Sequence, residues 1–116
     1  MRLLVCGSRT WESRDEIRRQ LLDLKPDEVI HGGARGADRL AGEVARELGI
    51  PVRAFPADWK RLGRKAGPVR NQQMLDEGQP DRVLAFRMEG DSPGTDDMIR
   101  RARKAGLPLR IVKPKR

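Results

Sequence analysis

The tripeptide Gly-x-Pro occurs three times in this chain, and it constrains the fold more than any other feature. The copies begin at Gly49, Gly78 and Gly106, and each lies between a helical pattern and a short apolar run. Glycine suits the left-handed turn that ends a helix, and proline prevents the helix from resuming. A helix–turn–strand unit that recurs in this way predicts β-α repeats, and therefore a mostly parallel sheet with helices on both faces.

The apolar pattern predicts where these elements lie. Strand-length runs with β-branched residues occupy 3–6, 28–31, 52–55, 82–86 and 109–112. Helical periodicity is clear at 17–24, 37–48 and 98–105, and a weaker, shorter helix is predicted at 69–75. We expect a capping box from Ser13 to Glu16, an irregular basic stretch at 57–67 and a frayed tail at 113–116. The expected fold class is α/β, a Rossmann-like three-layer sandwich in which about four helices flank a five-stranded, mostly parallel sheet.

Length and composition narrow the class of protein. A chain of 116 residues is the size of one domain, so we expect a single domain over 1–116. One Cys and one His exclude an intramolecular disulfide and a Cys/His zinc cluster, and we expect neither a metal nor a cofactor. No apolar run approaches a membrane span, and the apolar start is too short for a signal peptide. We therefore expect a cytoplasmic protein without membrane contact, whose net charge of +8 favours anionic partners.

The carboxyl ends of parallel strands meet at one edge of the sheet, where Rossmann-like folds bind ligands. Loops rich in small, polar and basic residues follow four of the predicted strands at this edge. The candidate ligand-binding residues are Gly7, Ser8, Arg9, Trp11, Gly32, Gly33, Ala34, Arg35, Gly36, Asp38, Arg70, Asn71, Ser92, Gly94 and Thr95.

Two of these loops are candidate anion sites. Glycines 32, 33 and 36 would let backbone amides approach a phosphate at the start of the next helix, although a tight βα turn uses glycine for steric reasons alone. The loop is neither a dinucleotide GxGxxG motif nor a P-loop. The turn at 92–95 is either a second anion nest or an ordinary helix cap, and Asp96 and Asp97 would already offset its positive end.

Other side chains have alternative interpretations. Arginines 9, 35 and 70 are suited to gripping a phosphate. Asp38 either stabilises a helix start or binds a ribose, as Asn71 also could. His31 is more typical of a structural partner than of a catalyst. Trp11 and Trp59 either stack on a base or pack within the protein. The basic run at 60–65 is a candidate ligand or nucleic-acid contact, whereas that at 100–104 is typical of a solvated helix face.

Several blocks in order resemble a known family: GSRTW, GGARGAD with RLAGEVARELGIPV, AGPVRNQQM, and GDSPGTDDMI followed by AGLPL. Together they resemble the small YspA-like members of the SLOG superfamily, which is named for the Smf/DprA DNA-processing proteins and the lonely-guy phosphoribohydrolases. The resemblance covers nearly the whole chain. It implies a Rossmann-like sheet with a pocket for nucleotides or nucleotide-derived ligands.

The lonely-guy enzymes within this superfamily hydrolyse the N-glycosidic bond of a nucleoside monophosphate. Arg70 resembles their upstream arginine, and the turn at 92–95 resembles their glycine–threonine turn. The family's glutamate position falls on Met98, which cannot do the same chemistry. Hydrolysis would require another carboxylate, Asp38 or Asp97, so Arg70 and Asp38 are the catalytic candidates.

Two functions follow as hypotheses. The first is a pocket that binds or senses a nucleotide or nucleotide-derived ligand, with hydrolysis left open. The alternative is a nucleic-acid-binding module of the DNA-processing type that uses the basic loop and helix faces, although the chain has only two Trp, two Phe and no Tyr for base stacking. The resemblance also leads us to expect a homo-oligomer.

Overall fold

Strands and helices alternate from the start of the chain to its end. The computed structural model describes residues 1–114. The strands are β1 (Arg2–Gly7), β2 (Glu28–His31), β3 (Val52–Ala54), β4 (Arg82–Phe86) and β5 (Leu109–Val112). The helices are α1 (Arg14–Leu24), α2 (Ala37–Glu47), α3 (Trp59–Leu62), α4 (Ala66–Gly78) and α5 (Pro93–Lys104), with a 3-10 turn, η1 (Gly63–Lys65), between α3 and α4.

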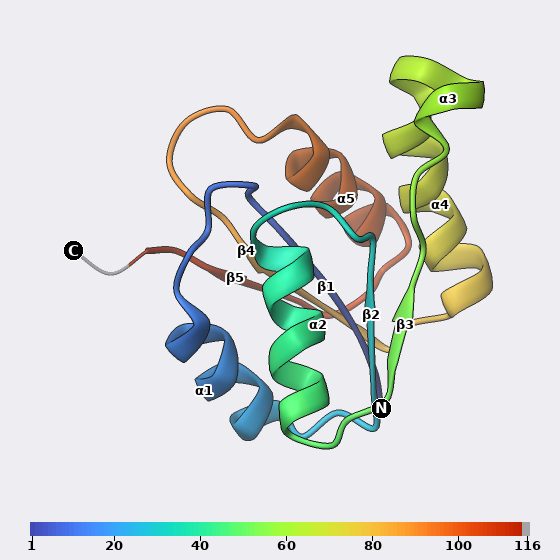
Figure 1. The fold of residues 1–116 in the computed structure, drawn as a ribbon. Coiled ribbons are helices and arrows are strands. Elements are labelled where there is room, and N and C mark those ends of the chain that lie inside the picture. The colour runs from blue at the N-terminus through green and yellow to red at the C-terminus, as the bar shows by residue number, and fades with distance from the viewer. Residues whose placement is uncertain (115–116) are drawn as a thin grey trace.

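All five strands are parallel and form one sheet in the order β3-β2-β1-β4-β5. The chain builds outward from β1 to β3 on one side, then crosses back to place β4 beside β1. The strand order therefore reverses between β1 and β4, the position at which open α/β sheets bind ligands. The loops that follow β1, β2 and β4 come together at this edge, at the top of Figure 1.

The two faces of the sheet have separate hydrophobic cores. Because successive side chains of a strand point to opposite faces, Leu3 and Val5 pack under α1 and α2, whereas Leu4 and Cys6 pack under α4 and α5. Figure 1 shows the two pairs of helices on the two sides of the sheet. The Rossmann-like three-layer sandwich expected from the sequence is thereby confirmed.

The segment before β4 departs from its prediction. Helix α4 spans 13 residues rather than the short segment at 69–75, and 57–67 is not irregular, because it contains α3, η1 and the start of α4. The buried face of α4 consists of Ala66, Gly67, Asn71, Met74 and Gly78. Small and polar residues leave almost no apolar periodicity, so the helix pattern is weak in the sequence.

The three Gly-x-Pro turns are not equivalent. Gly49 and Gly106 adopt the expected left-handed conformation, with φ of 75° and 73°. Gly78 instead remains in α4, and Gln79 takes the left-handed position with φ of 46°. A Cβ on Gly78 would lie 3.2 Å from Ile30 Cδ1, so this glycine serves helix–sheet contact.

The sheet ends in two short edge strands. The outer strand β3 has three residues, and the guanidinium of its Arg53 lies 5.0 Å from the centre of the Phe55 ring. At the other edge, Arg110 of β5 donates hydrogen bonds to Gln20 and Asp23 of α1. Lys113 and Pro114 of the expected tail have no regular structure, and 115–116 lie outside the described residues. Within residues 1–114, no helix has both the length and the apolarity to cross a membrane.

Candidate functional site

A cavity of about 310 Å³ lies where the strand order reverses. Ten of the candidate residues line it: Gly7, Ser8, Arg9, Ala34, Asp38, Arg70, Asn71, Ser92, Gly94 and Thr95. The sequence analysis did not select Cys6, Thr10, Met74, Asp91 and Pro93, which line it as well. Cys6 of β1 and Met74 of α4 are core residues, so their apolar character in the sequence did not indicate a binding site. The loops after β1 and β4 and the start of α4 therefore converge.

A second cavity of about 480 Å³ adjoins the first and shares Arg9, Ala34 and Arg70 with it. The candidates Gly32, Gly33 and Arg35 line this second cavity instead.

Two candidates line neither cavity. Trp11 is only 3% exposed and packs in the core with its ring centre 5.1 Å from that of Phe86. Its indole N–H donates to the Ser13 carbonyl at 3.1 Å, so Trp11 is a packing residue here and does not present a face for stacking. Gly36 lies beneath the β1 loop, where a Cβ would collide with the carbonyl oxygens of Ser8 and Arg9.

Three amides of the loop before α2 are already bonded within the protein. The Asp38 carboxylate accepts from the Gly32 amide at 2.9 Å and from the Ala34 amide at 3.4 Å, and His31 Nδ1 accepts from the Gly33 amide at 3.0 Å. This loop was expected to offer these amides to a phosphate. The Asp38 carboxylate binds two of these amides and His31 binds the third, so none of the three is available to a ligand.

The glycines of the same loop have steric functions. Gly33 and Gly36 adopt φ of 73° and 77°, a region that residues with a Cβ rarely occupy. Gly32 leaves room for the guanidinium of Arg70, which a Cβ would strike. Of the two interpretations of these glycines, the structure supports the tight βα turn.

The start of α5 is different. Ser92 precedes the helix without capping it, and Pro93 has no N–H. Among residues 1–114, no group accepts a hydrogen bond from the Gly94 or Thr95 amide, while the Asp96 amide donates to the Ser92 carbonyl at 2.9 Å. Helix N-termini with unsatisfied amides attract anions. The start of α5 therefore has two amides without an acceptor in the lining of the cavity.

A line of hydroxyl groups supports this turn from below. The Met88 amide donates to Ser8 Oγ at 2.9 Å, Ser8 Oγ donates to Ser92 Oγ at 3.2 Å, and Ser92 Oγ donates to Thr95 Oγ1 at 2.8 Å. All three hydroxyl-bearing residues are buried. The bonds hold the β1 loop and the start of α5 in a fixed relation.

The two acidic residues of this helix start are paired with arginines. Arg87 binds both oxygens of Asp96 at 2.9 and 3.1 Å, and Arg101 binds Asp97 at 2.8 Å. Asp97 is partly buried, which opposes its ionisation, but hydrogen bonds from Arg101 and Asn71 lower its pKa. Neither carboxylate lines the cavity, so neither blocks an anion there.

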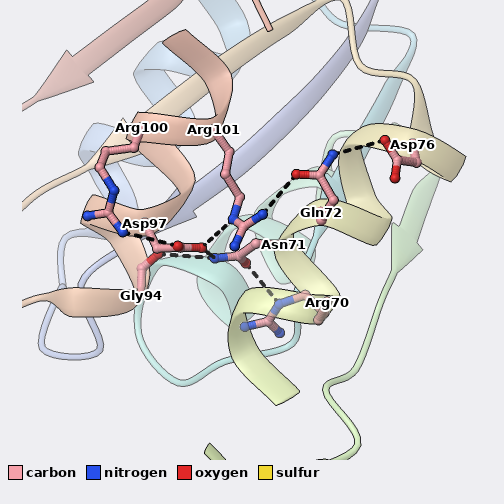
Figure 2. A network of polar contacts seen from close by, with 8 residues as sticks. All are labelled: Arg70, Asn71, Gln72, Asp76, Gly94, Asp97, Arg100 and Arg101. Atoms are coloured by element: carbon pink, nitrogen blue, oxygen red, sulfur yellow. Dashed lines mark hydrogen bonds and ion pairs between the residues drawn. The ribbon is translucent and has the colours of Figure 1, made fainter. Parts of the chain in front are cut away.

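Arg70 and Asn71 begin a network that joins α4 to α5 (Figure 2). Arg70 Nε donates to Asn71 Oδ1 at 3.1 Å, and Arg70 Nη1 donates to the Gly32 carbonyl. The Asn71 amide donates to the Gly94 carbonyl at 3.2 Å and to Asp97 at 2.9 Å. Asn71 was a candidate ribose ligand, but its side chain is committed to positioning the start of α5.

Burial is the main cause of the pKa shifts of three ionisable groups in and near the cavity. It raises the pKa of the Asp38 carboxyl to about 6, although Arg70 and two amide donors favour the charged form. It also raises the pKa of the Cys6 thiol, which keeps that thiol neutral, as a core cysteine. Burial, with Arg46 and Arg70 nearby, lowers the pKa of His31 to about 4.

His31 has a structural position at the end of β2. It is 5% exposed, its Nδ1 holds the Gly33 amide, and its Nε2 faces Gly42, where a Cβ would approach to 2.7 Å. Nε2 is buried without a hydrogen-bond partner among the described residues. His31 lines neither cavity.

The carboxylates place limits on catalysis. Met98, at the family's glutamate position, is completely buried in the core under α4 and α5. Asp97 is directed to the network of Figure 2, so Asp38 and Asp91 are the acidic residues of the cavity. Across residues 1–114, no three His, Cys, Asp or Glu side chains cluster closely enough to hold a metal ion.

An all-parallel sheet with a cavity where the strand order reverses defines a Rossmann-like domain. Residues 1–62 match the model of the YspA, cpYpsA-related SLOG family. The chain is also 41% identical to the gene 61 protein of Mycobacterium phage D29 over 121 residues, covering 93% of each protein. The chain belongs to this SLOG family.

A solved structure shows the same fold. DNA processing protein A (DprA) from Streptococcus pneumoniae superposes with a TM-score of 0.59 at 17% identity, over 96% of this chain and 58% of the DprA chain. The chain thus spans little more than half of that protein. Family membership connects the chain in general terms with nucleotides or nucleic acids.

Proposed function

We propose that the cavity at the carboxyl edge binds a nucleotide or nucleotide-derived ligand, whose phosphate lies at the start of α5. The observation that carries the proposal is the pair of unbonded amides at Gly94 and Thr95 in the lining of a cavity that also contains Arg9 and Arg70. Amides at a helix N-terminus and guanidinium groups are complementary to a phosphate.

The rest of the lining is suited to a nucleoside. Cys6, Met74 and Pro93 provide apolar surface, and Ser8, Thr10 and Asp91 provide polar groups. Small-molecule sites typically combine apolar walls with a few polar groups that set orientation, and their volumes begin at about 300 Å³. A cavity of about 310 Å³ therefore matches a ligand of mononucleotide size.

Binding or sensing is favoured over hydrolysis. The lonely-guy chemistry needs a carboxylate where this chain has a core methionine, Met98. The Asp38 carboxylate is held by the Gly32 and Ala34 amides, which makes it a positioning residue for its own loop. Prolonged incubation with AMP, followed by chromatography, tests for hydrolysis. Release of free base would show that the protein also cleaves the N-glycosidic bond.

Calorimetry with AMP, ADP-ribose, NAD and cyclic AMP tests the proposal directly. Arg9→Gln removes an exposed guanidinium from the cavity and should weaken binding about tenfold or more, the value of one charged hydrogen bond. Arg103→Gln is the matched control, because Arg103 is exposed and lines neither cavity. A folded protein that binds none of these probes would refute the proposal.

The nucleic-acid alternative is favoured by one observation, the basic segment from Lys60 to Lys65 in α3 and η1, which is largely exposed. Ionic strength separates the two functions. Binding of single-stranded DNA through many phosphate contacts falls steeply with salt. Binding of a mononucleotide through two amides and two guanidinium groups should fall only modestly.

A further inference from the structure

The second cavity has an unbalanced charge. Its volume of about 480 Å³ is bounded by the side chains of Arg9, Arg35, Arg39 and Arg70, and its lining contains no acidic residue. Arg39 Nε donates to the Gly33 carbonyl at 3.3 Å, whereas the side chains of Arg9 and Arg35 make no hydrogen bond or ion pair among residues 1–114. Guanidinium groups gathered in a concave surface concentrate anions.

An exposed tryptophan lies in the wall of the same cavity. Trp59 is 51% exposed and belongs to neither hydrophobic core, whereas Trp11 is 3% exposed. Helix α3 carries Trp59, and the Asp58 carboxylate caps this helix by accepting from the Arg61 amide at 3.2 Å. Aromatic rings held at the surface beside basic residues form stacking platforms for bases.

The two cavities share a common wall. Arg9, Ala34 and Arg70 line both, so a ligand that fills the first cavity can continue into the second across these residues. Only the first cavity has the open amides of α5, and only the second has Arg35, Arg39 and Trp59. Each therefore provides one set of phosphate donors, but the second adds an aromatic surface.

We infer that the second cavity receives the second unit of a ligand in which two nucleotide units are joined through phosphate, with its base stacked on Trp59. The inference rests on the proposed function, since the first unit occupies the cavity at α5. Arg35 and Arg39 contact the bridging or second phosphate. Either a free dinucleotide with a pyrophosphate link or the end of a nucleic-acid strand with a phosphodiester link has this chemistry.

The test compares probes that differ by one unit. AMP has one base, ADP-ribose has a second ribose without a base, and NAD and the dinucleotide pdApdA have two bases. We expect NAD or pdApdA to bind about fivefold to 100-fold more tightly than AMP and to quench tryptophan emission, because stacking on Trp59 adds to affinity. ADP-ribose should lack the quenching. The stronger of NAD and pdApdA identifies the source of the ligand.

Variants assign the effect to the second cavity. Trp59→Ala should abolish both the quenching and the preference for NAD over ADP-ribose, which has the same pyrophosphate without the second base, while leaving AMP affinity unchanged. Arg35→Gln should weaken NAD or pdApdA more than AMP. Lys60→Gln removes an equal charge from α3 outside both cavities and should change neither. Circular dichroism confirms that each variant is folded.

The outcomes separate the two proposals. Equal affinities for AMP, NAD and pdApdA with unchanged emission would overturn the second subsite and leave the proposed function standing. A preference for NAD over ADP-ribose that survives Trp59→Ala would also overturn it. Absence of binding by every probe would instead remove the proposed function, and this inference with it.

Discussion

The loops before α2 and α5 both follow a strand, contain glycine and start a helix at the same edge of the sheet, yet their amides are used differently. In the first loop, the Asp38 carboxylate and His31 occupy three amides. In the second, the acidic residues of the helix start are bound by arginines, and the Gly94 and Thr95 amides have no acceptor among residues 1–114. Loop amides at a helix start can therefore be satisfied by the protein's own side chains, and glycine content alone does not show whether they are.

The largest expected effect comes from a methyl group in the loop before α2. Gly36→Ala forces a Cβ into the carbonyl oxygens of Ser8 and Arg9 at a φ of 77°. Backbone strain of about 1–3 kcal/mol and an overpacking cost of similar size should lower the free energy of unfolding by about 4 kcal/mol. Urea denaturation measures this loss. Wild-type stability in Gly36→Ala would mean that the two loops are not packed as described.

The second largest expected effect is a change in the free energy of unfolding with pH, caused by the buried Asp38 carboxyl. The pKa of Asp38 is raised from 3.8 to about 6, so the folded protein holds a proton there that the unfolded chain has lost. Stability from this group is therefore present below pH 4 and is lost as the pH rises to about 6, a change on the order of 3 kcal/mol. Relative to wild type, Asp38→Asn should become more stable across this window.

His31 acts in the opposite direction in nearly the same window. Its pKa is lowered from 6.5 to about 4, so the unfolded chain binds the extra proton and stability rises with pH between these values. The two effects largely cancel in the wild-type protein. His31→Asn, which keeps an acceptor for the Gly33 amide, should expose the Asp38 effect as a fall in stability from pH 4 to 6. Parallel curves for wild type and both variants, in denaturation at several pH values, would contradict the assignment.

A smaller effect should follow from removal of the hydroxyl that joins the loop before α5 to the β1 loop. Ser92→Ala deletes the acceptor of Ser8 Oγ and the donor to Thr95 Oγ1. A loss of about 1 kcal/mol in the free energy of unfolding is expected for these buried bonds. Thermal unfolding of Ser92→Ala measures it, beside Ser13→Gly, which removes the N-cap hydroxyl of α1 outside the cavity lining.

The smallest effect on stability should come from the loop before α5. A Cβ on Gly94 meets no atom within 4 Å, so Gly94→Ala should change stability by no more than about 0.5 kcal/mol. The added methyl group enters the cavity lining beside the open amides, and we expect AMP affinity to fall by about tenfold. Calorimetry and urea denaturation on one sample separate the two. If Gly94→Ala lowered the free energy of unfolding as much as Gly36→Ala, the two loops would not differ in packing as described.

Much of this architecture was predictable because it depends on local patterns. The strands needed only short apolar runs, and the convergence of Arg9, Asp38, Arg70 and the 92–95 turn followed from the parallel topology. Helix α4 was underpredicted, because Asn71 and two glycines on its buried face carry no apolar period.

The division of roles within the site required coordinates. Sequence alone does not show that the Asp38 carboxylate accepts from amides of its own loop, because an Asp at a helix start also stabilises the helix through its charge alone. The sequence left Trp11 as either a stacking surface for a base or a packing residue, and its contact with Phe86 decides for packing. The sequence analysis did not predict the second cavity, because Trp59 is distant in sequence from Arg35 and Arg39 and only the fold places the three in one lining.

The two edge strands of the sheet affect how copies of this chain could associate. Strand β3 is three residues long with Arg53 at its centre, and β5 has Arg110 tied to α1. Short margins bearing cationic side chains are poor templates for strand addition from another molecule. Pairing of edge strands between two copies is therefore disfavoured.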